Sequence, residues 1–180
     1  MAKGKKSGGK RPESRTRRSR RRLPWLVGIG VAVLLAGVGA YRYWLEQPGQ
    51  FFPSQGNQHL AGPDMPHIPY NSDPPTSGPH LPYVAPWGVH TKPIQRELQV
   101  HNLEDGGVLI QYSCDCPDLV ARLRAIVERY RDHVVLAPYP TMKSRIALTA
   151  WSRLEAFDEF DERRIVRFIE AYRGIDHHPR

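Results

Sequence analysis

The feature that constrains this chain most is an uncharged apolar stretch near its N-terminus. Residues 23–41 read LPWLVGIGVAVLLAGVGAY and contain no charged side chain. As a helix, this stretch rises about 1.5 Å per residue and extends roughly 28 Å, close to the thickness of a bilayer's hydrocarbon core. Trp25 at one end and Tyr41 and Trp44 at the other are amphipathic aromatics of the kind that lie at membrane interfaces. The sequence therefore predicts a single transmembrane helix over residues 23–41.

A basic segment precedes this helix and predicts its orientation. Residues 1–22 hold eleven of the 26 Lys and Arg but only one of the 18 Asp and Glu. Because positively charged flanks stay in the cytoplasm, residues 1–22 are predicted to be a cytoplasmic tail on anionic lipid, and the C-terminal domain is predicted to be extracytoplasmic. A cleaved signal peptide is the alternative, with Val38-Gly39-Ala40 as its small-residue site, but the long basic and apolar segments favour an uncleaved anchor.

The net charge of +8 does not indicate nucleic-acid binding. Outside the basic tail, residues 23–180 carry 15 basic and 17 acidic side chains, so the exported part presents no cationic surface of the kind that binds phosphate backbones. The lipid bilayer is the predicted partner, and nucleic acid is not.

Composition divides the rest of the chain into a linker, a domain and a tail. Residues 42–69 are rich in Pro, Gly, Gln and Asn and lack a hydrophobic period, which predicts an extended linker. Residues 70–174 are long enough for one compact domain, and residues 175–180 form a short tail.

The domain has an irregular N-terminal half and a regular C-terminal half. Closely spaced prolines before residue 94 exclude a long helix there. Apolar runs and periodicity then predict a β-α-β-β-α order: strand 108–112, helix 117–131, strands 133–139 and 145–151, and helix 159–172. The predicted fold is α+β, with the helices packed on one small sheet.

Two peptides in the irregular half have unusual composition: YNSDPPTSGPH at 70–80 and HNLEDGG at 101–107. Together with Trp87-Gly88-Val89, Glu97 and ALTAW at 147–151, they resemble the DUF3105 family over residues 66–172. That resemblance implies a bacterial protein of unknown function, usually membrane-anchored, and hence a place in the bacterial inner membrane. The family's second motif usually reads HNLEHG, so Asp105 stands where a second imidazole is usual.

The first peptide predicts that His80 is presented on a rigid turn. Pro74 and Pro75 stiffen the backbone, Gly78 permits a positive φ, and Pro79 restricts the residue before it. A pre-positioned imidazole is what a metal ligand or a general base requires.

In the second peptide, the geometry depends on the local structure. His101 and Glu104 share a face if the segment is a helical turn and point to opposite faces if it is a strand. Gly106-Gly107 allow a close backbone approach or a sharp turn into the next strand.

Three interpretations of these residues remain open. In the first, His80 and His101 ligate copper or zinc, and Glu104, Asp105 or the cysteines complete the shell. In the second, the histidines only bond backbone groups and hold the loops together. In the third, His101 acts with Glu104 or Glu97 in acid–base catalysis; Ser77 is not favoured as a nucleophile because G-x-S-x-G is lacking. The other histidines of the linker and tail, His59, His67, His177 and His178, are expected in solvent.

Cys114 and Cys116 are the only cysteines, and they lie between a predicted strand and a predicted helix. A helix N-terminus favours their thiolates, an oxidising compartment allows a disulfide, and free thiolates would bind a soft metal. The placement is similar to that in thioredoxin-like proteins, although the C-x-C spacing differs and the first βαβ unit is not predicted. A strand of about 17 Å separates them from His101, so His80 is expected to lie nearer His101.

The leading hypothesis from the sequence is therefore a metal-binding module rather than an enzyme, with copper slightly preferred over zinc because of the Cys-x-Cys pair. A thiol–disulfide oxidoreductase using that pair is the alternative. A non-catalytic structural or assembly protein of the cell envelope is the third hypothesis.

Overall fold

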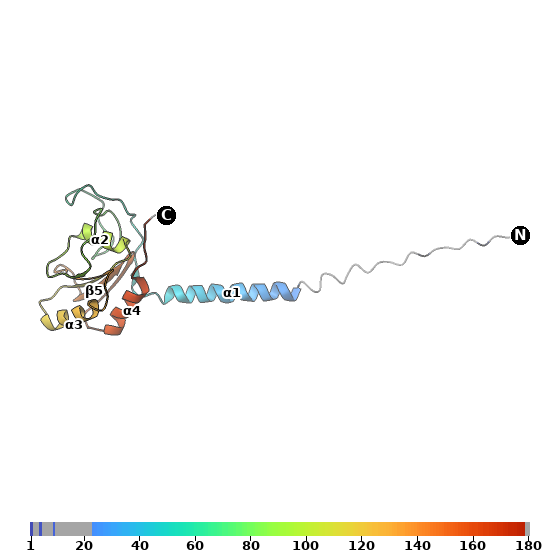
Figure 1. The fold of residues 1–180 in the computed structure, drawn as a ribbon. Helices are drawn as coiled ribbons and strands as arrows, with labels where there is room; N and C mark the ends of the chain where they lie inside the picture. Colours follow the sequence, from blue (N-terminus) through green and yellow to red (C-terminus); the bar gives the residue numbers. More distant parts are fainter. Residues whose placement is uncertain (2–3, 5–8, 10–22, 179–180) are drawn as a thin grey trace. The chain divides into compact units, whose positions relative to one another are not determined.

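The computed structural model describes residues 23–178 together with Met1, Gly4 and Gly9 (Figure 1). The chain divides into two compact units, Met1–Gln47 and Pro48–Arg180. Apart from those three residues, the predicted basic tail, 1–22, lies outside the described part.

The first unit contains one helix, α1, at Leu23–Leu45. Within the described residues it is the one helix long and apolar enough to cross a membrane, over Pro24–Arg42, and none of that stretch is buried. The helix predicted over 23–41 thus continues to Leu45. Nothing in its sequence breaks a helix before the Pro48-Gly49 pair, which explains the extra turn.

The second unit is built on a mixed six-stranded sheet with the order β1-β6-β5-β3-β4-β2. The strands are β1 Gln50–Phe51, β2 Gly88–Val89, β3 Val108–Tyr112, β4 Val134–Pro138, β5 Ile146–Ala150 and β6 Arg153–Phe157. The central strand β3 runs parallel to β4 and antiparallel to β5. β2 pairs parallel with β4, while β6 pairs antiparallel with both β5 and β1.

Helices cover both faces of this sheet (Figure 1). α3 (Pro117–Val127) and α4 (Glu162–Tyr172) pack on one face, where their apolar side chains meet Val108 and Ile110 of β3. The intervening Leu109 points to the other face and packs with Leu103 of α2 (Arg96–Glu104). Because side chains alternate along a strand, β3 contributes to two cores and is buried on both sides. The predicted α+β class and apolar N-terminal helix are confirmed at this level.

The predicted order omitted α2, β1, β2 and β6. β1 and β2 have two residues each, too short for any hydrophobic period. β6 follows β5 through a tight turn in which Ser152 adopts a φ of 61°, a conformation that serine seldom takes. The helix predicted to reach Arg131 ends at Val127.

The segment predicted as linker, 42–69, behaves differently on either side of Pro48. From Pro48 onward it belongs to the second unit, where β1 pairs with β6 and Leu60 is buried. Its backbone groups are satisfied by the loop that follows: Gly78 N–H donates to Gly56, His80 N–H to Gln58, and Leu60 N–H back to His80. A stretch without a hydrophobic period is thus ordered by backbone pairing with a distant loop.

Candidate metal centre

The loop that ends at His80 is fixed from both sides. Gly78 has a φ of +112°, and a Cβ there would lie 3.3 Å from the Tyr70 ring, so glycine fits this position best. The Tyr70 hydroxyl donates a hydrogen bond to the Pro79 carbonyl at 2.6 Å. His80 itself is fully buried. The structure therefore presents His80 on a constrained turn; the Asp73–Pro74 peptide within it is cis.

His59 reaches the same place by pairing with this loop. An isolated parallel bridge joins His59 to His80, and the backbone bonds of His80 to Gln58 and Leu60 flank it. The ring centroids of His59 and His80 lie 5.0 Å apart. The expectation of a solvated His59 in a linker is wrong: its side chain is 47 % exposed, but its ring faces the cluster.

His101 and Glu104 come from the last turn of α2, so the helical alternative for this segment is the one found. Three residues apart on a helix, they lie on one face. Asn102 between them points elsewhere and clamps Ala85, accepting from its N–H and donating to its carbonyl, each at 2.9 Å. This clamp fixes the rotation of α2 and with it the direction of the two cluster side chains.

The two glycines after α2 permit close packing that any side chain would block. A Cβ on Gly107 would lie 2.4 Å from the Asn102 carbonyl oxygen. A Cβ on Gly106, which has a φ of +80°, would lie 2.7 Å from the backbone nitrogen of Ile175. The predicted roles of Gly106-Gly107, a close approach and a sharp turn into β3, are both observed.

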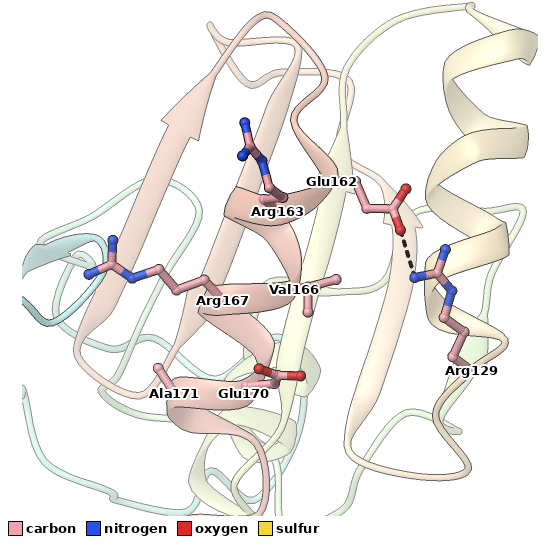
Figure 2. A pocket seen from close by; sticks show the side chains of 7 residues that line it. All are labelled: Arg129, Glu162, Arg163, Val166, Arg167, Glu170 and Ala171. Carbon is pink, nitrogen blue, oxygen red and sulfur yellow. Dashed lines mark hydrogen bonds and ion pairs between the residues drawn. The ribbon is translucent and has the colours of Figure 1, made fainter.

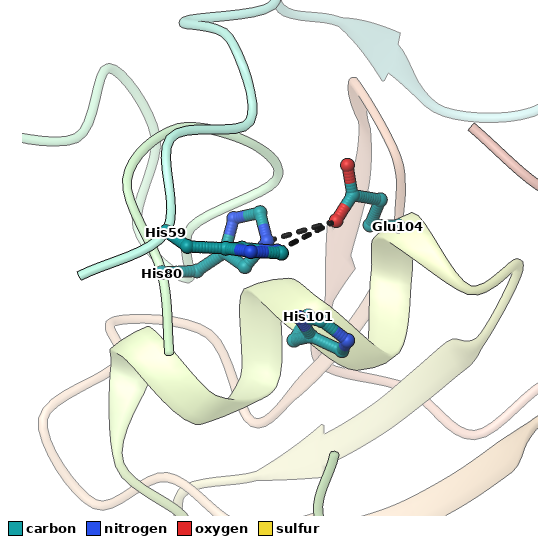
Figure 3. Close-up of side chains that lie close together, drawn as sticks. All are labelled: His59, His80, His101 and Glu104. Atoms are coloured by element: carbon teal, nitrogen blue, oxygen red, sulfur yellow. Dashed lines mark hydrogen bonds and ion pairs between the residues drawn. The ribbon is translucent and has the colours of Figure 1, made fainter. Parts of the chain in front are cut away.

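These elements bring His59, His80, His101 and Glu104 together (Figure 3). One ligand atom from each lies within 4.8 Å of every other. The ring of His101 is 5.1 Å from that of His80 and 5.3 Å from that of His59. The expectation that His80 lies near His101 is confirmed. Three of the four residues are buried, and only His59 opens to solvent.

The hydrogen bonds of His80 place two acceptors face to face. Its Nδ1 lies 2.7 Å from the Gly78 carbonyl oxygen, which can only accept, so Nδ1 carries a proton. In a neutral ring Nε2 then has a lone pair, and it lies 2.9 Å from Oε2 of the Glu104 carboxylate. The Nε2 of His59 faces the same oxygen at 3.7 Å. At this distance the pair is a hydrogen bond that requires a proton on one of the two atoms, and a bound metal ion would replace that proton.

Two further atoms of the cluster lack partners among the described residues. Glu104 Oε1 and His101 Nδ1 are buried and make no hydrogen bond. Buried polar atoms without partners are rare in folded proteins and call for a specific explanation. Burial also lowers the pKa of His101 below its ordinary value, which keeps the imidazole in its neutral, metal-binding form.

The C-terminal tail also reaches this site, contrary to the expectation of solvated histidines there. Gly174 N–H bonds Gly106, His177 N–H bonds the Glu104 carbonyl at 2.9 Å, and the His177 ring stacks on Trp151. His178 Nε2 lies 3.5 Å from Glu104 Oε2 and 3.6 Å from Asp105 Oδ1.

Asp105 therefore belongs to a second, neighbouring group that it forms with His101 and His178. The hydrogen bond that His178 makes to Asp176 raises the pKa of the His178 imidazole.

Of the residues in the catalytic hypothesis, the structure brings His101 and Glu104 together but leaves Glu97 and Ser77 outside the cluster. Glu97 pairs with His67 at 3.3 Å rather than with His101. Ser77 accepts a hydrogen bond from the Gln55 N–H and is buried. Cys114 and Cys116 form a disulfide and pack against the α3–α4 core, on the other face of the sheet from α2, so no cysteine completes the histidine cluster.

A hollow elsewhere on the domain is unrelated to this cluster. An open groove of about 700 Å³ lies between Arg129 and the outer side of α4. Figure 2 shows Arg163, Arg167 and Glu170 along that helix. Arg129 pairs with Glu162 at 2.7 Å across the groove. Its lining contains neither histidine nor cysteine and consists mostly of charged surface side chains, so it offers no site comparable to the cluster.

Comparison with protein families gives one match. The model of a family described as "Protein of unknown function (DUF3105)" matches residues 64–180. No curated protein and no solved structure gives a significant match. The match includes the whole of residues 66–172, on which the resemblance in sequence rests, and confirms it. The match also includes His177 and His178, which indicates that the tail is part of the domain. His59 lies before the first matched residue, and nothing in the sequence indicates its role.

Proposed function

Because the chain belongs to the DUF3105 family, whose function is unknown, we propose a function from the site alone: the domain is a metal-binding module whose ligands are His59, His80, His101 and Glu104. The observation that carries the proposal is the convergence of four ligand atoms, one from each of these residues, within 4.8 Å of one another in a mostly buried place. A divalent cation held by these residues would also supply a partner for the buried cluster atoms that make no hydrogen bond among the described residues.

The surroundings of His80 support a metal rather than a proton alone. Metal-ligating histidines usually donate their second ring N–H to a carbonyl or carboxylate, and His80 does so to Gly78. A proton would satisfy one pair of acceptors, but the Nε2 atoms of His59 and His178 converge on the same carboxylate oxygen. Several nitrogen and oxygen ligand atoms that surround one small volume are typical of a metal site.

The donor set favours zinc. Three imidazoles and a carboxylate supply four ligands of the types that tetrahedral Zn²⁺ takes, and Cu²⁺ is the competing ion. The sequence favours copper only if Cys114 and Cys116 are thiolates. Their disulfide, packed in the other core, removes that argument.

The arrangement supports binding or handling of the metal rather than catalysis. Four protein ligands fill a tetrahedral shell, whereas catalytic zinc keeps a position for water. The half-exposed His59 offers a route for exchange. We propose that α1 anchors this module in the bacterial inner membrane, with residues 1–22 on anionic lipid in the cytoplasm and the metal site on the extracytoplasmic face.

Metal content tests the proposal. The full chain, purified in detergent without a histidine tag, is loaded with Zn²⁺, passed through a desalting column and analysed by mass spectrometry. We expect one zinc per chain in the wild type and in Glu97→Gln, and less than a tenth of that in Glu104→Gln. Glu97 is a matched control because it lies on the same helix and pairs with His67, outside the cluster. Equal zinc in both variants, or none in the wild type, would contradict the proposal and favour a structural role.

A further inference from the structure

The Cys114–Cys116 disulfide is the strongest chemical feature that the metal site does not use. It follows β3 directly and precedes α3, whose N-cap is Cys116 and whose first residue is Pro117. Both cysteines are half-buried, and Asp115 between them is exposed. The disulfide therefore lies at the surface of the domain, within reach of another chain.

This disulfide has little to contribute to stability. Cross-links stabilise mainly by restricting the unfolded chain, and the effect grows with the length of the closed loop. Here the cysteines are two residues apart, so the loop contains a single residue. Stabilisation of the fold, which explains most disulfides of exported proteins, is therefore a weak explanation for this pair.

The topology around the pair resembles that of thioredoxin-like proteins, which is an analogy of fold. β3, α3 and β4 form a parallel βαβ unit, β5 and β6 form an antiparallel hairpin beside β3, and α3 and α4 cover the same face. The order β4-β3-β5-β6 is the strand order of the thioredoxin-like core. In such proteins the reactive cysteines lie between the first strand and its helix, which is where Cys114 and Cys116 lie. This βαβ unit corresponds to the predicted strand 108–112, helix 117–131 and strand 133–139.

The local geometry distinguishes the two sulfurs. Cys116 is the N-cap of an eleven-residue helix, where the helix dipole and free N–H groups stabilise a thiolate. Cys114 lies two residues before Cys116 and directly after Ser113, which is bonded to the loop before β5 through Ser144 and Arg145. The sulfur that leaves most readily in thiol–disulfide exchange is the one whose thiolate is more stable, so Cys116 is the leaving sulfur.

We propose that the Cys114–Cys116 disulfide is a redox-active site that accepts two electrons from a protein dithiol. A partner thiolate attacks the Cys114 sulfur, the disulfide breaks, and Cys116 leaves as a thiolate at the N-terminus of α3. The partner's second thiolate then attacks the partner sulfur of the mixed disulfide and releases Cys114. The partner loses two protons and two electrons and gains a disulfide; Cys114 and Cys116 become thiols. This activity is independent of the metal site.

The test uses the full chain in detergent and a synthetic peptide with two cysteines as the dithiol probe, under nitrogen. We expect one equivalent of peptide disulfide per chain, formed at least tenfold faster than with the same concentration of oxidised glutathione. The variant Cys114→Ser/Cys116→Ser gives none while its zinc content stays equal to wild type. Oxidation no faster than by glutathione, or thiols already free in the purified protein, would overturn the proposal.

The single variants test the assignment of the sulfurs. Cys114→Ser leaves Cys116 free, and Cys116→Ser leaves Cys114 free. Because the helix N-terminus favours the Cys116 thiolate, we expect Cys116 to react with a small aromatic disulfide at pH 6 at least fivefold faster than Cys114. Equal or reversed rates would contradict the assignment of Cys116 as the leaving sulfur.

Discussion

The histidine cluster and the cysteine pair lie on opposite faces of one sheet and are built in opposite ways. The cluster takes its side chains from three separate segments, at 59, 80 and 101–104, and depends on backbone bonds between loops for its geometry. The pair occupies three consecutive residues between a strand and a helix. An assembled site is sensitive to every contact that aligns its segments, whereas a local site needs only its own strand–helix junction. Perturbations should therefore separate the two.

The largest effect is expected from His80→Ala. This change leaves the Glu104 carboxylate buried without its nearest cationic or metal-bridged partner, and breaking such a pair costs about 3–5 kcal/mol. Urea unfolding of the full chain measures this loss. His67→Ala, which removes a part-exposed pair with Glu97, is the control and should cost less than about 1 kcal/mol. Similar small losses for both variants would mean that His80 is not held in a buried charged network.

Gly107→Ala tests whether the close approach behind α2 supports the cluster. The new methyl group would lie 2.4 Å from the Asn102 carbonyl oxygen, and relieving such overpacking costs about 1–3 kcal/mol. We expect lower stability and weaker zinc binding, while the rate of disulfide exchange at the cysteine pair is unchanged. Gly62→Ala, where nothing lies within 4 Å of the added Cβ, should change none of these quantities. Unaltered zinc affinity in Gly107→Ala would show that the cluster does not depend on this alignment.

His59→Gln sharpens the comparison, because it removes a ligand without removing a buried contact. The side chain is 47 % exposed, so we expect little change in stability. Loss of one of four ligands should weaken zinc binding by about 10–100-fold, which corresponds to roughly 1.4–2.7 kcal/mol. Titration with a competing zinc chelator measures the affinity, with His90→Gln as a control at a histidine outside the cluster. Equal affinity in wild type and His59→Gln would remove His59 from the shell.

The smallest effect on stability is expected from Cys114→Ser/Cys116→Ser. Because the disulfide closes a loop of one residue, its loss should change the free energy of unfolding by less than about 1 kcal/mol. Urea unfolding under non-reducing conditions is the measurement. A loss of several kcal/mol would identify the disulfide as a structural element and weaken the redox proposal.

The contrast between the sites also explains what sequence could predict. The pair, its strand and its helix were predictable because β3 is an apolar run and α3 is an amphipathic segment with a proline at its start. The spacing of His101 and Glu104 was consistent with one helical face. His80 was found through the composition of its loop.

His59 and His178 could not be predicted as members of the site. His59 is positioned by backbone hydrogen bonds that join Gly56, Gln58 and Leu60 to the 78–80 loop. Any residue type can make such bonds, so the sequence does not indicate them. His178 depends on the approach of the tail to Gly106, which only the glycine itself indicates. The two-residue strands β1 and β2 could not be predicted either, because their pairing depends on residues distant in the chain.

The most direct test of the central claim is the effect of zinc on the unfolding of the wild type and of Glu104→Gln. At a zinc concentration 100 times Kd, binding stabilises a folded protein by about 2.7 kcal/mol. We predict this gain in the wild type relative to a chelator-treated sample, and none in Glu104→Gln. Equal unfolding of the wild type with zinc and with chelator would contradict the account.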